Sequence, residues 1–352
     1  MMSELNKIAL KILSGGKGIL AADESTATMS KRLEAVKVDS NEKNRLLFRK
    51  TLFSSESMKN CIGGVILYDE TIKQETGSET IPELINNNGA VTGIKVDTGA
   101  KILANSPEEK ITEGLDGLRD RLKEYYKLGA RFTKWRGVYS ISEKYPSLLS
   151  INSNAHALAR YSAIVQESGM VPIVEPELLM DGNHSAAICF EKTSQVIKKC
   201  FDELIINKVD LSGIILKPNM ILDGSSATKK ITNQEVADLT IKCLNNSVPE
   251  EVPGIAFLSG GQSEVEATEN LNLINKKNNT NFIMTYSYGR ALQQSALRHW
   301  SKNIDDISGT QKIFNHRANM CSLAAQGKWS KELETKSKFI YLISPNKINK
   351  KF

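Results

Sequence analysis

Three lysines stand near the ends of runs that are otherwise apolar: Lys95 in AVTGIKVD, Lys134 in FTKWRGV and Lys217 in LSGIILKPN. Burial and neighbouring cations both disfavour the protonated form of an amine. A lysine whose pKa falls a few units below about 10.4 has a much larger neutral fraction near pH 7, and a neutral amine attacks a ketone. We expect Lys217 to be this nucleophile because its run is the most apolar of the three. A single lysine in such a place is also explained by a strand that ends in solvent.

Carboxylates accompany the lysines. Glu175 and Glu177 are two residues apart in MVPIVEPE, so a strand places both on one face, and Pro176 stiffens the backbone between them. One carboxylate is then suited to move protons and the other to orient partners. The alternative is a pair that only neutralises the lysines. Asp23, near the end of GILAADES, adds a third carboxylate.

Small and basic residues after two other runs are typical of phosphate binding. Gly260 and Gly261 follow Ser259 and precede a helix start, an arrangement that exposes backbone N–H groups to an anion. Gly289 and Arg290 end the next run and are expected to join them. A second phosphate is expected across the site, at Ser25, Thr28, Lys95 and Arg136.

These residues need a scaffold that brings distant parts of the chain together. Eight short apolar runs begin 27 to 45 residues apart, which leaves room in each interval for one strand, one helix and two loops. Most runs end in charged or hydroxyl residues, and the C-terminal ends of barrel strands are where active sites lie. We predict an α/β protein with a single (β/α)₈ TIM barrel; an open doubly wound sheet is the alternative. The runs are 18–25, 63–70, 90–97, 132–138, 170–177, 211–219, 252–261 and 282–290.

The composition favours one continuous globular domain. The chain has 352 residues, of which 40% are hydrophobic and 24% charged, and no stretch resembles an interdomain linker. We expect a barrel over residues 1–330 and a mobile C-terminal tail over 331–352. The formal charge of +6 is spread along most of the chain, which argues against a nucleic-acid partner and suits anionic small molecules.

Cysteine and histidine usage excludes two further kinds of site. The five cysteines are far apart and odd in number, so a disulfide framework is not expected. The four histidines form no pair at metal-ligand spacing, so we expect no metal. No apolar run approaches 18 residues, and the N-terminal segment lacks a signal-peptide core. We therefore expect a cytoplasmic protein without membrane insertion.

With these motifs in order, the chain closely resembles class I (Schiff-base) fructose-1,6-bisphosphate aldolase over about residues 5–329. The matching segments are GKGILAADES, CIGGVIL, GIKVD, GLDGL, KWR, ARYS, VPIVEPE, LKPNM, FLSGGQSE, SYGRALQ and AQGKW. The resemblance implies a homotetrameric barrel that needs no cofactor. It also implies reversible cleavage of fructose 1,6-bisphosphate to dihydroxyacetone phosphate and glyceraldehyde 3-phosphate, in glycolysis and gluconeogenesis. Breaking C3–C4 needs an electron sink, and with isolated histidines an imine is favoured over a zinc ion.

The resemblance also implies a role at each matching position. Lys217 is similar to the Schiff-base lysine, Glu175 to the acid/base that dehydrates the carbinolamine, and Glu177 to the residue that supports the amine. Asp23 matches the residue that helps remove the C4 hydroxyl proton, and Lys134 the cation beside the imine. The 1-phosphate site corresponds to Ser259, Gly260, Gly289 and Arg290, with Gly261 beside them, and the 6-phosphate site to Ser25, Thr28, Lys95 and Arg136.

Two positions depart from the family pattern. Thr28 replaces a serine but keeps the hydroxyl. The family typically ends in a tyrosine that assists proton transfer to the carbanion, whereas this chain ends in Phe352, with Tyr341 eleven residues upstream. We expect slower release of the enamine than in relatives that end in tyrosine.

Other functions remain open from the sequence. One alternative is a Schiff-base aldolase for a related sugar phosphate, such as fructose 1-phosphate; Lys95 and Arg136 favour two phosphates. Another is an additional scaffold role, because the resemblance implies binding of actin or of adhesin tails. A scaffold that had lost catalysis would be expected to lose Lys217 or Glu175, and both are present.

Overall fold

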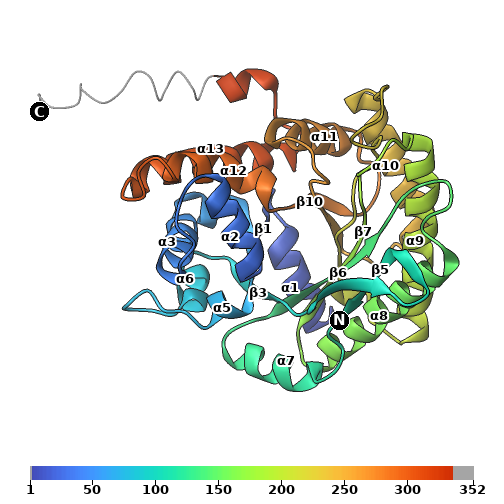
Figure 1. Cartoon of the computed structure of the whole chain (residues 1–352), viewed down its shortest axis with the longest axis horizontal. Helices are drawn as coiled ribbons and strands as arrows, with labels where there is room; N and C mark the ends of the chain where they lie inside the picture. Colours follow the sequence, from blue (N-terminus) through green and yellow to red (C-terminus); the bar gives the residue numbers. More distant parts are fainter. Residues whose placement is uncertain (1, 336–352) are drawn as a thin grey trace, which may run out of the picture.

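The computed structural model describes residues 2–335, and a closed barrel of eight parallel strands lies at their centre (Figure 1). Each of the eight predicted runs contributes one strand, so the predicted (β/α)₈ fold is confirmed. Around the barrel the strands are β1 (Gly18–Ala22), β2 (Ile62–Leu67), β3 (Val91–Lys95), β6 (Phe132–Tyr139), β7 (Val171–Leu178), β8 (Ile215–Leu216), β9 (Gly254–Phe257) and β10 (Ile283–Tyr288).

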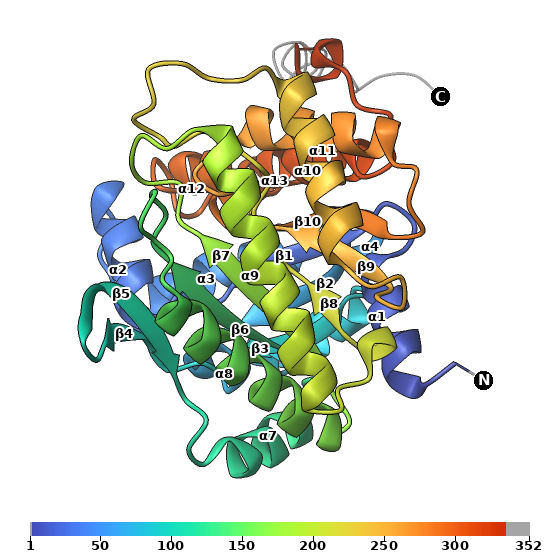
Figure 2. The same ribbon diagram turned by 90° about the vertical axis from the view of Figure 1, so that its right-hand side faces the viewer.

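Helices surround these strands on the outside, and in the turned view α8, α9 and α10 lie side by side over one flank of the barrel (Figure 2). In chain order the helices are α1 (Glu4–Leu13), α2 (Thr26–Ala35), α3 (Glu42–Phe53), α4 (Ser57–Cys61), α5 (Asp69–Ile72), α6 (Ile81–Asn87), α7 (Leu118–Lys127), α8 (Leu148–Glu167), α9 (Ala186–Ile206), the 3₁₀ turn η1 (Leu211–Gly213), α10 (Asn233–Ser247), α11 (Glu264–Lys277), α12 (Arg290–Trp300) and α13 (Ile307–Ala324).

Side-chain caps explain where several helices begin. Two helices begin at capping boxes: Thr232 with Glu235 starts α10, and Ser263 with Glu266 starts α11. Ser25 caps α2, its hydroxyl accepting the Thr28 N–H. Helix α2 therefore begins only a few residues beyond β1, which places its first turn at the mouth of the barrel.

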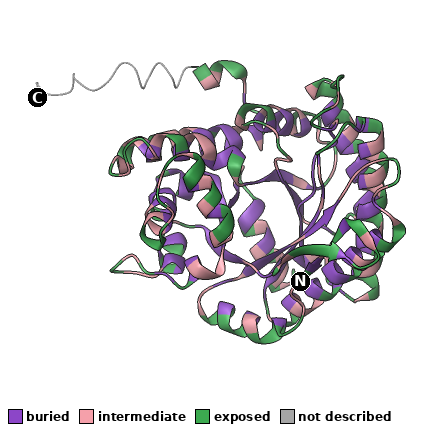
Figure 3. Cartoon of the chain, in the orientation of Figure 1, coloured by how far each residue is buried: buried purple, intermediate pink, exposed green. Residues whose placement is uncertain are grey.

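Strand alternation separates two apolar layers. Inward residues of the strands pack with Ile12 and Leu13 of α1, and this helix closes the N-terminal end of the barrel. Outward residues such as Ile94 and Leu216 join the larger core beneath the helices, as predicted, and most residues of the barrel strands are buried (Figure 3). Gly93 faces inward, where a Cβ atom would collide with the Phe132 ring. Glycine at this position leaves room for Phe132 below the level of the lysines.

Strand β8 is shorter than the run that predicts it. Residues 211–213 form η1 instead, with Asp210 accepting the Ser212 N–H, and the ladder ends at Leu216. Pro218 has no N–H to continue the pairing. Lys217 still donates its N–H to the Val174 carbonyl at 2.8 Å, so the residue is fixed at the end of the strand.

A hairpin between β3 and β6 has no counterpart among the predicted elements. Its antiparallel strands are β4 (Gly99–Leu103) and β5 (Ser106–Glu113), joined at a turn in which Asn105 has a φ of 63°. Thr112 ties the hairpin to the barrel by donating to the Arg136 carbonyl at 2.7 Å. Its charged, mostly exposed sequence does not stand out as a strand when apolar runs are sought.

Most of the expected tail, including Tyr341 and Phe352, lies outside the described residues. Of its first part, residues 331–335 are described, and Glu334 there forms an ion pair with Arg317 at 2.6 Å and accepts from the Trp329 indole at 2.9 Å. The division at residue 330 stays a prediction. Within residues 2–335 no helix has the length and apolar character needed to cross a membrane.

Candidate active site

A cavity of about 600 Å³ opens at the C-terminal ends of the strands. All fourteen residues predicted for the site line it, although they come from seven of the eight βα segments. They are Asp23, Ser25, Thr28, Lys95, Lys134, Arg136, Glu175, Glu177, Lys217, Ser259, Gly260, Gly261, Gly289 and Arg290.

Four of these side chains form a continuous buried chain of charges across the cavity floor. The Nζ atom of Lys134 lies 2.9 Å from Oδ2 of Asp23 and 3.2 Å from Oε2 of Glu175. The other oxygen of Glu175, Oε1, lies 3.0 Å from Nζ of Lys217. Lys134, Glu175 and Lys217 are each at most 4% exposed. Ion pairs in such a setting are screened little by water and hold one another in place.

The carboxylates in this chain are held ionised. Burial alone would raise the pKa of Asp23, but Lys134 and then Lys217 outweigh it and lower the pKa to about 2. The same two lysines lower the pKa of Glu175 against the effect of burial. At neutral pH the structure therefore places an ionised carboxylate against the amine of Lys217, in a position to accept or return a proton.

Among the three lysines, Lys134 is held as a cation. Burial lowers its pKa, yet Asp23 and Glu175 raise it well above the usual range, so Lys134 is a permanent cation. The physical reason is that carboxylates alternate with the lysines, and their partners could not be identified from the sequence. Lys134 is thus suited to electrostatic stabilisation rather than to nucleophilic attack.

The wall beside this chain is also built from compensated charges. Arg136 pairs with Glu177, which raises the pKa of the guanidinium despite its burial. Lys95 lies 3.2 Å from Asp97, whose side chain is almost fully buried. Sequence reasoning missed Asp97, although it stands two residues after Lys95. Because Glu177 contacts Arg136, its predicted support of the Lys217 amine stays a prediction.

Backbone groups dominate the side of the cavity formed after β9 and β10. Gly260 and Gly261 have φ values of 55° and 82°, in the region that favours glycine, and a Cβ at Gly261 would meet only open space. Gly289 is the N-cap of α12 and makes no side-chain cap, so this helix end is available to an anion beside Arg290. These features match the predicted first phosphate site.

Hydroxyl and basic side chains dominate the adjoining part of the cavity, because β1 pairs with β10 and Arg32 of α2 donates to Gln293 of α12 at 3.1 Å. The hydroxyls of Ser25 and Thr28 lie 3.0 Å apart at the start of α2. Lys31 and Arg32, one turn further along α2, also line the cavity and were missed. Their spacing from Thr28, three and four residues, is the signal that places them on the same helix face. Ser287, almost fully buried on β10, was also missed, and its inward parity two residues before Gly289 is the signal that could have indicated it.

A barrel whose mouth joins a buried lysine and carboxylate to two anion-binding sides has the features of a sugar-phosphate enzyme with an amine nucleophile. Comparison with known proteins is consistent with this class. A sequence model of the family described as "Glycolytic: Fructose-bisphosphate aldolase class-I" matches residues 4–346.

Individual relatives cover nearly the same range. The probable fructose-bisphosphate aldolase class 1 of Xanthomonas campestris pv. campestris is 45% identical over 331 residues, which are 93% of this chain and 99% of that protein. Human fructose-bisphosphate aldolase C is 47% identical over 329 residues, 93% of this chain and 90% of that protein. Fructose-bisphosphate aldolase from Plasmodium falciparum, solved in complex with TRAP and a small-molecule inhibitor, has a TM-score of 0.91 at 44% identity, covering 93% of this chain and 95% of that one.

The chain belongs to the class I fructose-bisphosphate aldolase family. It is a glycolytic lyase that cleaves fructose 1,6-bisphosphate reversibly to dihydroxyacetone phosphate and glyceraldehyde 3-phosphate through a lysine Schiff base, without a metal. The function and enzyme class predicted from the sequence are confirmed, and the substrate is a phosphorylated sugar.

Proposed function

We propose that Lys217 is the amine that forms the Schiff base and that Glu175 moves its protons. The supporting observation is the contact of 3.0 Å between Lys217 Nζ and Glu175 Oε1 inside a buried, charge-compensated site. Glu175 takes a proton from the Lys217 ammonium group, and the neutral amine attacks the C2 ketone. Glu175 then returns this proton to the C2 hydroxyl of the carbinolamine, which leaves as water. The product is an iminium ion at C2, with Lys134 as the neighbouring cation.

Asp23 acts in the next step. Its carboxylate accepts the proton of the C4 hydroxyl as the C3–C4 bond breaks, so C4 becomes an aldehyde carbonyl. The electron pair of that bond moves onto C3 and into the iminium, which becomes an enamine. Protonation of C3 and hydrolysis of the imine then release dihydroxyacetone phosphate and regenerate Lys217. Glu177 orients its neighbours, with Arg136 as its described partner.

The two sides of the cavity hold the two phosphates in this proposal. The 1-phosphate lies against Ser259, the glycines after β9, and Arg290 at the start of α12. The 6-phosphate lies against Ser25, Thr28, Lys95 and Arg136, because these residues combine hydroxyl donors with cations. Two phosphate-binding groups in one cavity, with Lys95 and Arg136 across the barrel from the ends of β9 and β10, support a bisphosphate over a sugar with a single phosphate.

Chemical trapping tests the assignment of the lysine. Incubation with dihydroxyacetone phosphate and borohydride reduces the imine to a stable adduct, which peptide mass mapping then locates. We expect the adduct on Lys217 and on no peptide of a Lys217→Arg variant. Lys134→Arg is the matched control: it lies in the same cavity, keeps its charge, and should still allow labelling of Lys217. Labelling of Lys134 or Lys95 instead would overturn the proposal.

A related Schiff-base aldolase activity is the alternative. The second phosphate side decides between them, since fructose 1-phosphate cannot use it. We expect Lys95→Met to raise KM for fructose 1,6-bisphosphate by about tenfold and to leave KM for fructose 1-phosphate within about twofold, the loss of one charge-assisted contact. Equal effects on both substrates would favour a single-phosphate substrate.

We further propose a cytoplasmic homotetramer that binds actin or an adhesin tail at its basic mouth. Support comes from the family and from the Plasmodium falciparum relative, whose structure contains TRAP. Light scattering on the purified chain tests the tetramer, since a monomer or dimer at micromolar concentration contradicts it. Co-sedimentation with actin filaments, with and without fructose 1,6-bisphosphate as competitor, tests the scaffold role.

A further inference from the structure

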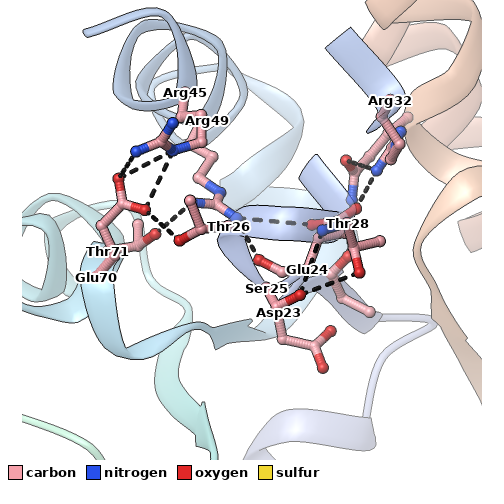
Figure 4. Close-up of polar contacts among 12 residues, drawn as sticks. Asp23, Glu24, Ser25, Thr26, Thr28, Arg32, Arg45, Arg49, Glu70 and Thr71 are labelled. Atoms are coloured by element: carbon pink, nitrogen blue, oxygen red, sulfur yellow. Dashed lines mark hydrogen bonds and ion pairs between the residues drawn. The ribbon is translucent and has the colours of Figure 1, made fainter. Parts of the chain in front are cut away.

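The chain segment after β1 has two faces with different partners. Asp23, Glu24 and Ser25 all line the cavity, but the Glu24 carboxylate is paired with Arg32 and the Glu24 carbonyl accepts from Arg49 on α3. Figure 4 shows the carboxylate of Asp23 on the opposite side of this segment from Arg45 and Arg49. Neither Arg45 nor Arg49 lines the cavity, so their outward contacts do not touch substrate but determine where Asp23 stands.

Arg49 makes the innermost of these outward contacts. It lies on α3 and is only 2% exposed. Its Nη2 donates to the Glu24 carbonyl at 2.9 Å and lies 3.9 Å from the Glu24 carboxylate, while its Nη1 donates to the Thr71 hydroxyl at 2.6 Å. The Nε atom of Arg49 is buried without a partner, so the contacts of Nη1 and Nη2 are the ones that compensate burial of the guanidinium and hold the backbone next to Asp23.

Neighbouring contacts extend this arrangement on either side. One turn earlier on α3, Arg45 forms an ion pair with Glu70 at 2.8 Å, and Thr26 donates to the same carboxylate at 2.9 Å (Figure 4). On α12, Gln293 donates to the Ala21 carbonyl at 2.7 Å. The segment of residues 21–26 is thus held from the outside at both ends and in the middle.

We propose that Arg49 is a positioning residue for the cleavage step: by holding the Glu24 carbonyl it keeps the Asp23 carboxylate where it accepts the C4 hydroxyl proton. This inference rests on the role proposed for Asp23. Arginine suits the task because one planar group donates to acceptors on two separate elements, the segment after β1 and the region of α5. A lysine has a single nitrogen and cannot reproduce this geometry.

The reaction itself offers a readout that separates positioning from general stability. Dihydroxyacetone phosphate has no C4, so its imine with Lys217 forms without Asp23 acting on a C4 hydroxyl. Cleavage of fructose 1,6-bisphosphate needs that proton transfer. A displaced Asp23 therefore slows cleavage selectively, whereas a partly unfolded protein loses both reactions in proportion.

The test is the variant Arg49→Lys, measured for kcat of fructose 1,6-bisphosphate cleavage and for the rate of borohydride trapping with dihydroxyacetone phosphate. We expect kcat to fall by about 10- to 100-fold, the size of effect that a misplacement of about 1 Å produces, and trapping to stay within about twofold. Leu52→Ala is the matched control, because it disturbs the buried face of the same helix without removing a contact to residues 21–26. It should lower Tm and leave the ratio of the two rates unchanged.

The Asp23→Asn background gives a second, independent reading. If Arg49 acts through Asp23, Arg49→Lys should cost less than about threefold in kcat there, because contacting or serially linked residues are not additive. An equally large loss of kcat in the parent and Asp23→Asn backgrounds would overturn the inference. Equal losses of the cleavage and trapping rates in Arg49→Lys would also overturn it, and so would an unchanged kcat. If Arg49→Lys does not fold, Thr71→Val removes one acceptor of the guanidinium and should show the same selectivity. Absence of a Lys217 adduct in the unmodified protein would instead reject the proposed function.

Discussion

The N-terminal and C-terminal halves of the barrel interior are built from the same strands, but the side chains that fill them differ in polarity and charge. Toward the N-terminal ends, residues such as Phe132, Ile173 and Ile215 form an apolar layer with α1. Two residues further along the same inward faces, Lys134, Glu175 and Lys217 form a chain of charges. The apolar layer can supply stability because it buries hydrocarbon, and the charged layer can supply chemistry because its charges are already paired and fixed in place.

The largest effect is expected from a substitution that changes the charged layer alone. Lys217→Gln removes the proposed amine but leaves Glu175 paired with Lys134, so the layer stays compensated. We expect kcat to fall by about 10⁴-fold or more, the order seen when a covalent nucleophile is removed, with little change in Tm. Steady-state kinetics with thermal unfolding measures both. A large fall in Tm would mean that Lys217 is mainly structural.

The second-largest effect is expected from a substitution that changes the apolar layer alone. Phe132→Ala leaves a cavity beneath the lysines and should lower the free energy of unfolding by about 3–5 kcal/mol. The kcat per folded molecule should change by less than about tenfold, because Lys134 is held by its own ion pairs. Denaturant unfolding and active-site titration by borohydride trapping provide the two values. Ile8→Ala, at the margin of this layer, is a milder control.

Lowering the pH separates the contributions of the two layers to stability, because only the charged layer contains groups that titrate. The pKa of Asp23 is lowered from 3.8 to about 2, so its ionised form stabilises the fold above pH 4, and this contribution is lost as the pH falls toward 2. For this largely buried group the contribution is on the order of 2 kcal/mol. The difference in unfolding free energy between the parent protein and Asp23→Asn should therefore shrink between pH 5 and pH 2.5. A difference independent of pH would contradict the ion pair with Lys134.

The smallest effect concerns the rim above the charged layer. Thr28→Ser restores the residue typical of the family and keeps the hydroxyl that lies 3.0 Å from Ser25. We expect KM for fructose 1,6-bisphosphate to change by less than about twofold, since the hydrogen-bonding group is retained. Thr28→Val, which removes the hydroxyl but keeps the shape, should raise KM more. Equal KM values for the two variants would exclude a phosphate contact by Thr28.

The charged layer also shows which features of the site can be predicted from the sequence and which cannot. Period-two alternation places Lys95, Lys134 and Lys217 on inward faces, because residue parity is local information. It does not reveal that Asp23 meets Lys134 across the barrel, so the carboxylates that raise the pKa of Lys134 could not be identified from the strand pattern. Partners on distant strands depend on barrel closure and on side-chain reach.

The hairpin β4–β5 and the contacts of Arg49 were out of reach for a related reason. The two strands of this hairpin, Gly99–Leu103 and Ser106–Glu113, pair with each other at the surface. They therefore lack the apolar runs by which the barrel strands are recognised in the sequence. Arg49 stands among charged residues on an ordinary amphipathic helix, and its burial becomes evident only when α3 packs behind β1. By contrast, Asp97 was within reach, since it shares the parity of Lys95.

Helix α1 determines the end of the barrel at which substrate can enter and products can leave. Ile12 and Leu13 fill the far end of the barrel, and the Ile12 backbone comes so close to Gly63 that a side chain there would not fit. The cavity is therefore closed at the N-terminal ends of the strands, and neither substrate nor product can pass through the barrel from one end to the other. The sugar must enter and both products must leave at the C-terminal ends of the strands, where the cavity opens.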